Sequence, residues 1–289
     1  SKNIGKGKII FILFDYSKQL VSLQQGVPES DYSVKHNLGI LGMEEPADLI
    51  YDKKFLDSNI PYADILEKFV IDLLPVPKWG KLPPGTNSAL ILSHDEDYSD
   101  KKYIKMIHEE VKNNISATYF STSFNTMATE NIEYFTKNKI ELGIHWDKFP
   151  NEIIFRKKSA QDLSRQIKLL KSKIISSRIH FLKWGNHYTN IFRHLIFNGV
   201  KIDSTYGQNF GKGYSFSTSY FFRPIDANGS IMPILELPFE IMENRGNANL
   251  TYLKKLIEEN NEKYHGVLCF NFHPSEYDSS KDFRSKIME

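Results

Sequence analysis

From residue 86 to the end of the chain, short apolar runs alternate with amphipathic segments, and this pattern constrains the fold more than any other feature. Short apolar runs are typical of strands buried on both faces of a sheet, and the segments between them have helical periodicity. The clearest expected helix covers residues 159–176. Repeated strand–helix units predict a parallel sheet, most simply closed as a barrel. We therefore expect an α/β fold: an irregular (β/α) barrel, a deformed TIM-like barrel of about seven strands.

The expected elements follow one another closely along this part of the chain. Strands are expected at 88–93, 115–121, 139–145, 178–183, 200–203, 217–223, 233–237 and 265–272. Further helices are expected at 101–113, 128–138, 188–198 and 248–262.

The first part of the chain, residues 1–85, does not share this alternation. Residues 8–14 have the composition of a buried strand, and a series of prolines after them interrupts every candidate helix. We place a domain boundary near residue 85, with an irregular N-terminal segment over 1–85 that packs on a barrel domain over 86–289. The glycine- and lysine-rich start of the chain also leads us to expect an upstream domain in the full-length protein.

Composition excludes several classes of protein. Lys and Arg total 37 against 35 Asp and Glu, so the net charge of +2 gives no reason to expect nucleic acid as a partner. The single cysteine, Cys269, excludes an internal disulfide and a cysteine-based zinc cluster. No apolar stretch approaches the roughly 18–20 residues that a membrane helix needs, so we expect no membrane span.

A His-Asp-Glu-Asp sequence at residues 94–97 follows one of the expected strands directly. Because alternate side chains of a strand point to one face, Asp95 and Asp97 would leave its end in the same direction. Two converging carboxylates repel each other unless a cation or a proton-transfer role keeps them together. The alternative is a solvated acidic turn that caps the following helix.

Other polar residues stand at the ends of the expected strands. In β/α barrels the functional site lies on the loops at the carboxyl ends of the strands. The residues at these ends are Asp95, Asp97, His145, Lys183, Trp184, Asp203, Glu236 and His273. Two aspartates and two histidines on one rim fit a divalent-metal site. The alternative for each histidine is an ordinary hydrogen-bonded place in the core or on the surface.

With its motifs in this order, the chain resembles the polysaccharide deacetylase superfamily, the NodB-homology or carbohydrate esterase family 4 group, over about residues 88–275. The segments that carry the resemblance are HDED at 94–97, ATYF at 117–120, ELGIH at 141–145, RIHFL at 178–182, VKIDST at 200–205, ELP at 236–238 and FHP at 272–274.

The resemblance implies a role for several of these residues. Asp95 would be the general base, and Arg178 would pair with it. Asp97 and His145 would bind a divalent metal, for which zinc is expected. His273 would be the general acid.

The chain departs from the family pattern at one position. The family has His-x-x-x-His, in which both imidazoles bind metal, and the fourth residue after His145 is Phe149. Because catalytic zinc sites use three protein ligands, Asp147 on the same loop or His187 elsewhere on the rim is expected to supply the third.

A sugar substrate would need its own contacts. Trp184 and Tyr206 follow strand ends and are expected to stack on sugar rings, although a place in the core is the alternative for each. Glu236 is expected on the substrate side through its resemblance to the fourth family motif.

These observations predict a metal-dependent hydrolase that removes N- or O-acetyl groups from a glycan, with Asp95 as base and His273 as acid. The alternative is a catalytically silent relative of the same fold that binds glycan or supports a larger assembly. Phe149 motivates this alternative directly.

Overall fold

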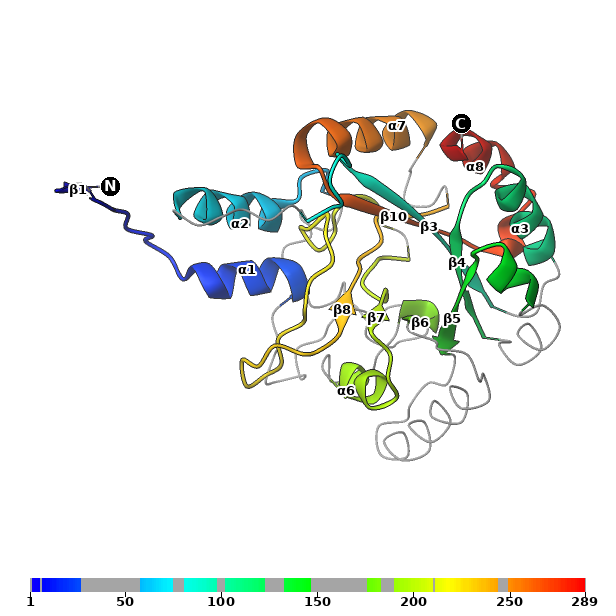
Figure 1. Cartoon of the computed structure of the whole chain (residues 1–289), viewed down its shortest axis with the longest axis horizontal. Coiled ribbons are helices and arrows are strands. Elements are labelled where there is room, and N and C mark those ends of the chain that lie inside the picture. Colours follow the sequence, from blue (N-terminus) through cyan, green and yellow to red (C-terminus); the bar gives the residue numbers. More distant parts are fainter. Residues whose placement is uncertain are drawn as a thin grey trace.

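The main feature of the computed structural model is a parallel sheet of eight strands in the order β8-β7-β6-β5-β4-β3-β10-β9 (Figure 1). The structure describes residues 2–5, 7–26, 58–74, 81–97, 102–122, 133–146, 176–182, 190–209, 211–243 and 249–288. The strands are β3 (Ala89–Glu96), β4 (Ala117–Ser121), β5 (Glu141–Trp146), β6 (Ser176–Ile179), β7 (Ile202–Asp203), β8 (Leu235–Glu236), β9 (Ile241–Met242) and β10 (Val267–Phe272). They curl into a half-barrel whose edges are β8 and β9. The expected α/β barrel-like fold is confirmed, with eight strands instead of about seven.

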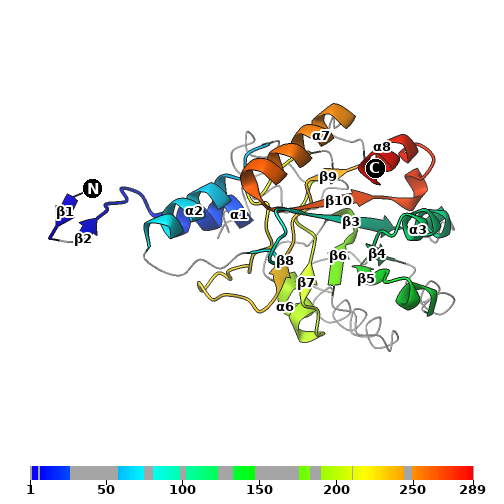
Figure 2. The same cartoon turned by 45° about the horizontal axis from the view of Figure 1, so that its top comes forward.

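Helices cover the outer face of this sheet (Figure 2). They are α3 (Lys102–Lys112), α6 (Asn190–Phe197), α7 (Leu250–Glu259), continued by the π-helical turn η5 (Asn260–Tyr264), and α8 (Lys281–Met288). One apolar cluster joins α3, α7 and α8 to β3, β4 and β10, and a second joins α6 to β5 and β6. Strands enclosed in this way need apolar residues on both faces, which explains the continuous apolar runs of the sequence.

Not every expected element is formed. The expected strand at 217–223 is wrong, because these residues form no strand and only Phe222 makes an isolated bridge, to Glu236. The expected helix at 159–176 lies outside the described residues except for Ser176, which begins β6. The one at 128–138 is described only from residue 133, with helix over 133–137 and a turn at 138. None of the described helices is long and apolar enough to cross a membrane.

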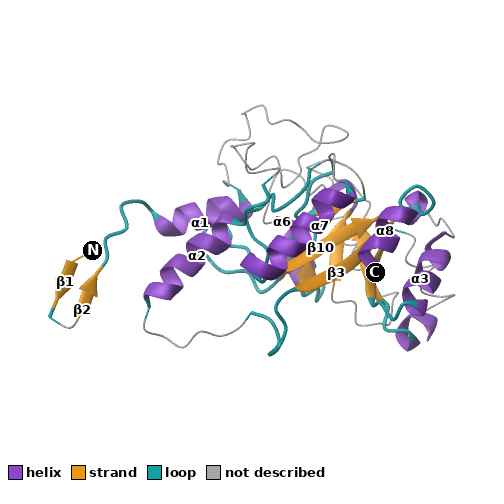
Figure 3. Cartoon of the chain, turned by 90° about the horizontal axis from the view of Figure 1, so that it is seen from above, coloured by secondary structure: helices purple, strands orange, loops and turns teal. Residues whose placement is uncertain are grey.

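The N-terminal part contains more regular structure than the sequence led us to expect. A hairpin of β1 (Lys2–Ile4) and β2 (Gly7–Ile9) is followed by helices α1 (Tyr16–Gln25) and α2 (Tyr62–Leu73), which lie side by side (Figure 3). The segment expected to be irregular therefore contains two helices that the prolines were expected to interrupt. Pro61 immediately precedes α2, where a missing N–H costs little.

The buried strand expected at 8–14 is also wrong. Strand β2 ends at Ile9, and the side chains of Phe11 and Leu13 are 69% and 94% exposed. An apolar run becomes a buried strand only where neighbouring strands and a core exist to receive it, and β2 pairs with β1 alone.

Buried polar contacts join α1 and α2 to the rest of the molecule. The side-chain amide of Gln25 donates to the carbonyl of Ile225 at 2.7 Å and accepts from its N–H at 2.9 Å. Asp64 accepts from the hydroxyl of Thr218 and the N–H of Ser219, each at 2.6 Å. The domain boundary near residue 85 stays a prediction.

Candidate metal centre

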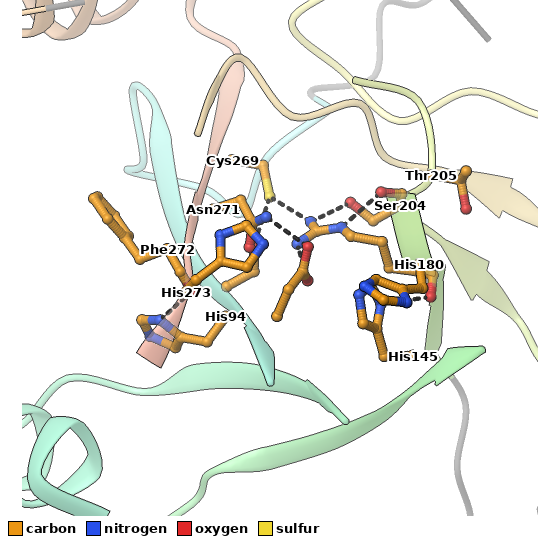
Figure 4. A network of polar contacts seen from close by, with 12 residues as sticks. His94, His145, His180, Ser204, Thr205, Cys269, Asn271, Phe272 and His273 are labelled. Atoms are coloured by element: carbon orange, nitrogen blue, oxygen red, sulfur yellow. Dashed lines mark hydrogen bonds and ion pairs between the residues drawn. The ribbon is translucent and has the colours of Figure 1, made fainter. Parts of the chain in front are cut away.

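Three ligand-type side chains meet at the carboxyl ends of the central strands, and two of them, His145 and His180, are seen side by side in Figure 4. Asp97 follows β3, His145 lies in β5, and His180 opens the 3-10 turn η4 (His180–Leu182) after β6. Asp97 Oδ1 is 3.3 Å from His145 Nε2 and 3.5 Å from His180 Nε2. One ligand atom from each of the three lies within 4.8 Å of the others. The parallel register brings these ends to one rim, as the sequence predicted for Asp97 and His145.

The chemistry of this group fits a divalent cation. His145 Nδ1 is 2.9 Å from the carbonyl oxygen of Arg178. Because a carbonyl only accepts, Nδ1 carries the hydrogen, and a neutral ring presents the lone pair of Nε2 to the buried Asp97 Oδ1. Two acceptors that face each other need positive charge between them. One carboxylate and two imidazoles, one of them fixed by a backbone carbonyl, form a donor set typical of zinc-like ions.

The titration of the same groups reflects this demand for positive charge. Burial disfavours the charged ring of His145, yet the carboxylates of Asp95 and Asp97 outweigh burial and raise the pKa of His145. Burial likewise works against the charged form of Asp97, and His145 outweighs it, so the pKa of Asp97 is lowered. In both cases the site favours a cation beside the carboxylates.

His180 was not among the metal ligands expected from the sequence. Those proposed for the third position, Asp147 and His187, lie outside the described residues, as does Phe149. The sequence nevertheless indicated that His180 could reach the site. In the expected strand at 178–183, Arg178 and His180 are two residues apart and would point to the same face.

Asp95 is held at both of its oxygens. Nη1 of Arg178 donates to Asp95 Oδ1 at 2.9 Å, and the side-chain amide of Asn271 donates to Oδ2 at 2.6 Å. Burial would raise the pKa of Asp95, but the Arg178 guanidinium and the nearby imidazoles outweigh it and hold the pKa below its usual range. The structure thus brings together Asp95 and Arg178, and it adds Asn271, which sequence reasoning missed.

Figure 4 shows His273 on the opposite side of the polar network from His145 and His180. Its Nε2 is 3.7 Å from Asp97 Oδ2, and its Nδ1 is 2.5 Å from Glu243 Oε1. Burial alone would lower the pKa of His273, but the Glu243 carboxylate raises it to about 9. His273 therefore carries a proton at neutral pH.

Glu243 is a second residue that sequence reasoning missed. It follows β9, is buried, and has φ 44°, in the left-handed region that residues other than glycine rarely adopt. Its carboxylate also accepts the backbone N–H of His273. Strained backbone of this kind is concentrated at functional sites, where the surrounding structure maintains it.

A family model described as WbmS-like polysaccharide deacetylase matches residues 92–278, which is more than half of the chain. The chain belongs to this family. The expected membership in the polysaccharide deacetylase superfamily is thereby confirmed. No curated protein matches the chain.

Several solved structures have a similar fold. A mutant of BA3943, a family 4 carbohydrate esterase pseudoenzyme from Bacillus anthracis with restored activity, is 14% identical, covers 77% of this chain and 68% of its own, and has a TM-score of 0.42. The family 4 carbohydrate esterase from Streptomyces lividans is 10% identical, with coverages of 66% and 81% and a TM-score of 0.41. The catalytic domain of the peptidoglycan N-acetylglucosamine deacetylase from Eubacterium rectale is 15% identical, with coverages of 74% and 88% and a TM-score of 0.41.

Of the residues expected to contact a sugar in this WbmS-like chain, the two that the structure describes, Tyr206 and Glu236, are buried. Tyr206 is 0% exposed, and its ring packs against Phe192, Phe216 and Phe222. A ring with no exposed surface cannot stack on a sugar, so we no longer assign Tyr206 this role. Trp184 lies outside the described residues.

Glu236 is also fully buried, and its carboxyl group contacts other residues of the protein core. One of its oxygens accepts the N–H of Tyr206 at 2.8 Å, and its carboxyl group lies beside that of Asp203. Asp203 in turn accepts the hydroxyl of Ser177 at 2.5 Å. Ser177 and the carboxyl pair therefore link β6, β7 and β8, and we no longer assign Glu236 to substrate binding.

Glu236→Gln (E236Q) is expected to weaken the dependence of stability on pH. Burial raises the pKa of Glu236, as does Asp203 beside it, and burial also raises the pKa of Asp203. Groups with raised pKa values stabilise the fold fully below the ordinary carboxyl range of about 4, and this stability is lost as pH rises through the folded pKa. Glutamine stays neutral, so E236Q should lose less stability than the wild type between about pH 5 and pH 8.

Urea unfolding at several pH values measures this effect. Glu258→Gln, at an exposed position of α7, is the matched control and should follow the wild type. Equal losses of stability with pH in E236Q and the wild type would show that the carboxyl pair is not proton-linked to folding.

Proposed function

We propose that this chain is a metal-dependent hydrolase that removes acetyl groups from a glycan by N- or O-deacetylation. The observation that carries the proposal is the convergence of Asp97 and His145 with Asp95 and His273 at one end of a parallel sheet. Family membership supports a glycan as the substrate.

Asp95 and its two donors suit the role of general base. A divalent metal ion, when held by Asp97 and His145, would polarise the acetyl carbonyl and lower the pKa of water toward about 7. Asp95 would accept the proton of the attacking water. Arg178 and Asn271 keep its carboxylate ionised and in one orientation.

His273 suits the role of general acid. Its Nδ1 is bound to Glu243, so Nε2 is the nitrogen free to face the reacting bond on the side of Asp97. A ring that carries a proton at neutral pH can deliver it to the departing amine or hydroxyl group. Glu243 compensates the charge of the ring before the transfer and fixes its orientation.

Acetate release tests the proposal. The protein is stripped of metal with a chelator, reloaded with zinc, and incubated with acetylated chito-oligomers and with O-acetylated oligosaccharides. Acetate should appear with the reloaded protein and not with the stripped one. A stoichiometric metal content without acetate from either substrate class would contradict the proposal and favour the alternative of a catalytically silent glycan-binding domain, which Phe149 motivates.

A further inference from the structure

We propose that His180 is the third protein ligand of the metal centre and replaces the histidine that the family pattern places at position 149. The inference rests on the proposed function insofar as that function requires a metal. It concerns which part of the chain completes the ligand set: a strand end instead of the loop after β5.

The position of the ring is the first argument. Nε2 of His180 approaches the same oxygen of Asp97 that faces His145, at 3.5 Å, and the two imidazole rings are 4.9 Å apart. The side chain of His180 is 3% exposed, whereas that of Asp97 is 21% exposed. The group is therefore closed on the histidine side and open beside Asp97, as a catalytic site with three protein ligands and one free position would be.

The backbone after His180 is the second, independent argument. Phe181 and Leu182 both have φ 56°, so two consecutive residues other than glycine occupy the left-handed region. Such a conformation is unfavourable for residues other than glycine and persists only where the surrounding structure imposes it. The ring of Phe181 stacks on that of His180 at 4.0 Å between centroids. The strained turn thus ends β6 with one imidazole directed at Asp97.

The end of β6 also connects His180 to the rest of the site. The side chain of Arg178 holds Asp95, and its carbonyl accepts the Nδ1 hydrogen of His145. Two residues later, His180 reaches the same carboxylate as His145. One short stretch of chain therefore orients the base, orients one ligand and supplies another.

The donor set predicts the class of metal. Two imidazole nitrogens and one carboxylate oxygen suit zinc, cobalt, nickel or ferrous iron. Magnesium and calcium prefer sites made of oxygen atoms. We expect cobalt and zinc to bind at one ion per chain and a large excess of magnesium not to displace them.

A cysteine at position 180 gives a direct spectroscopic test. In cobalt-loaded His180→Cys (H180C), a thiolate ligand should produce an intense near-ultraviolet charge-transfer band that the cobalt-loaded wild type lacks. His108→Cys, at an exposed position of α3, is the matched control and should show no such band. In His180→Ala, zinc affinity should fall by more than the roughly 10–100-fold that follows loss of a residue that only orients a ligand.

Magnetic resonance tests the same point by first counting the metal-bound imidazoles of the wild type. In protein loaded with NMR-active cadmium and labelled at its histidine nitrogens, two imidazoles should couple to the metal, and one coupling should vanish in His180→Gln. One metal per wild-type chain with no band in H180C, or with a single coupled imidazole, would overturn the assignment of His180 and leave the proposed function standing. A wild type that binds no zinc or cobalt would overturn both.

Discussion

Arg178→Met (R178M) is expected to lower the free energy of unfolding by about 3–5 kcal/mol, the largest effect of any single substitution at the site. Arg178 is fully buried, and its guanidinium lies between the rings of Phe120 and Phe239. Its Nη1 donates to Asp95, while Nε and Nη2 donate to the carbonyl and hydroxyl of Ser204 at 2.8 Å each. Methionine fills a similar volume, but it leaves a buried carboxylate without its counter-charge.

Urea unfolding at neutral pH measures this effect. Arg193→Met is the matched control, because the side chain of Arg193 is 51% exposed and its 3.5 Å contact with Asp226 is a surface ion pair. Such a pair contributes about 0–1 kcal/mol. The double variant D95N/R178M should be less destabilised than the sum of the two single variants, because the buried charge is removed together with its partner. Simple additivity would contradict the pairing of Asp95 with Arg178.

His273→Gln (H273Q) is expected to lower kcat/KM for an acetylated chito-oligomer by about 100- to 10,000-fold, the range that general acid–base groups contribute. The side-chain amide of glutamine can still donate a hydrogen bond to the Glu243 carboxylate, but it cannot deliver a proton. Metal content should stay at the wild-type level, because the group of candidate ligands comprises Asp97, His145 and His180. Kinetics and metal analysis of the same preparation provide both measurements.

Two further variants place this result in context. Glu243→Gln keeps a side chain of the same shape beside His273 but removes its charge, so it should reduce kcat less than H273Q does. His108→Gln, at an exposed position on α3, should leave both activity and metal content unchanged. An H273Q protein that is as active as the wild type would eliminate His273 as the general acid.

The sequence sufficed for the fold because its strongest signals are local. The apolar run of β3 and the amphipathic periodicity of α3 and α7 can each be recognised in the sequence within about a dozen residues. The order of strands and helices then implied a parallel sheet, and the rim at its carboxyl ends followed from that architecture. Asp97 and His145 were found in this way.

The remaining features depend on contacts between distant parts of the chain. Asn271 reaches Asp95 because β10 pairs with β3 in register, with Phe272 opposite His94. Glu243 reaches His273 because β9 pairs with β10. Neither pairing can be read from one strand alone. The sugar-binding role expected for Tyr206 was wrong for the same reason. Its backbone N–H is bound by Glu236 of another strand, and its side chain is buried in the core.

The hydrogen bonds of α1 and α2 affect how the protein can be produced for these experiments. Shortened at residue 85, the polypeptide would lose Gln25, Ala63 and Asp64, which pair with backbone groups of Ile225, Ser217 and Ser219. Those groups belong to the long segment between β7 and β8, so trimming the recombinant product to residues 86–289 would remove these hydrogen bonds from that segment. Expression clones should retain both helices.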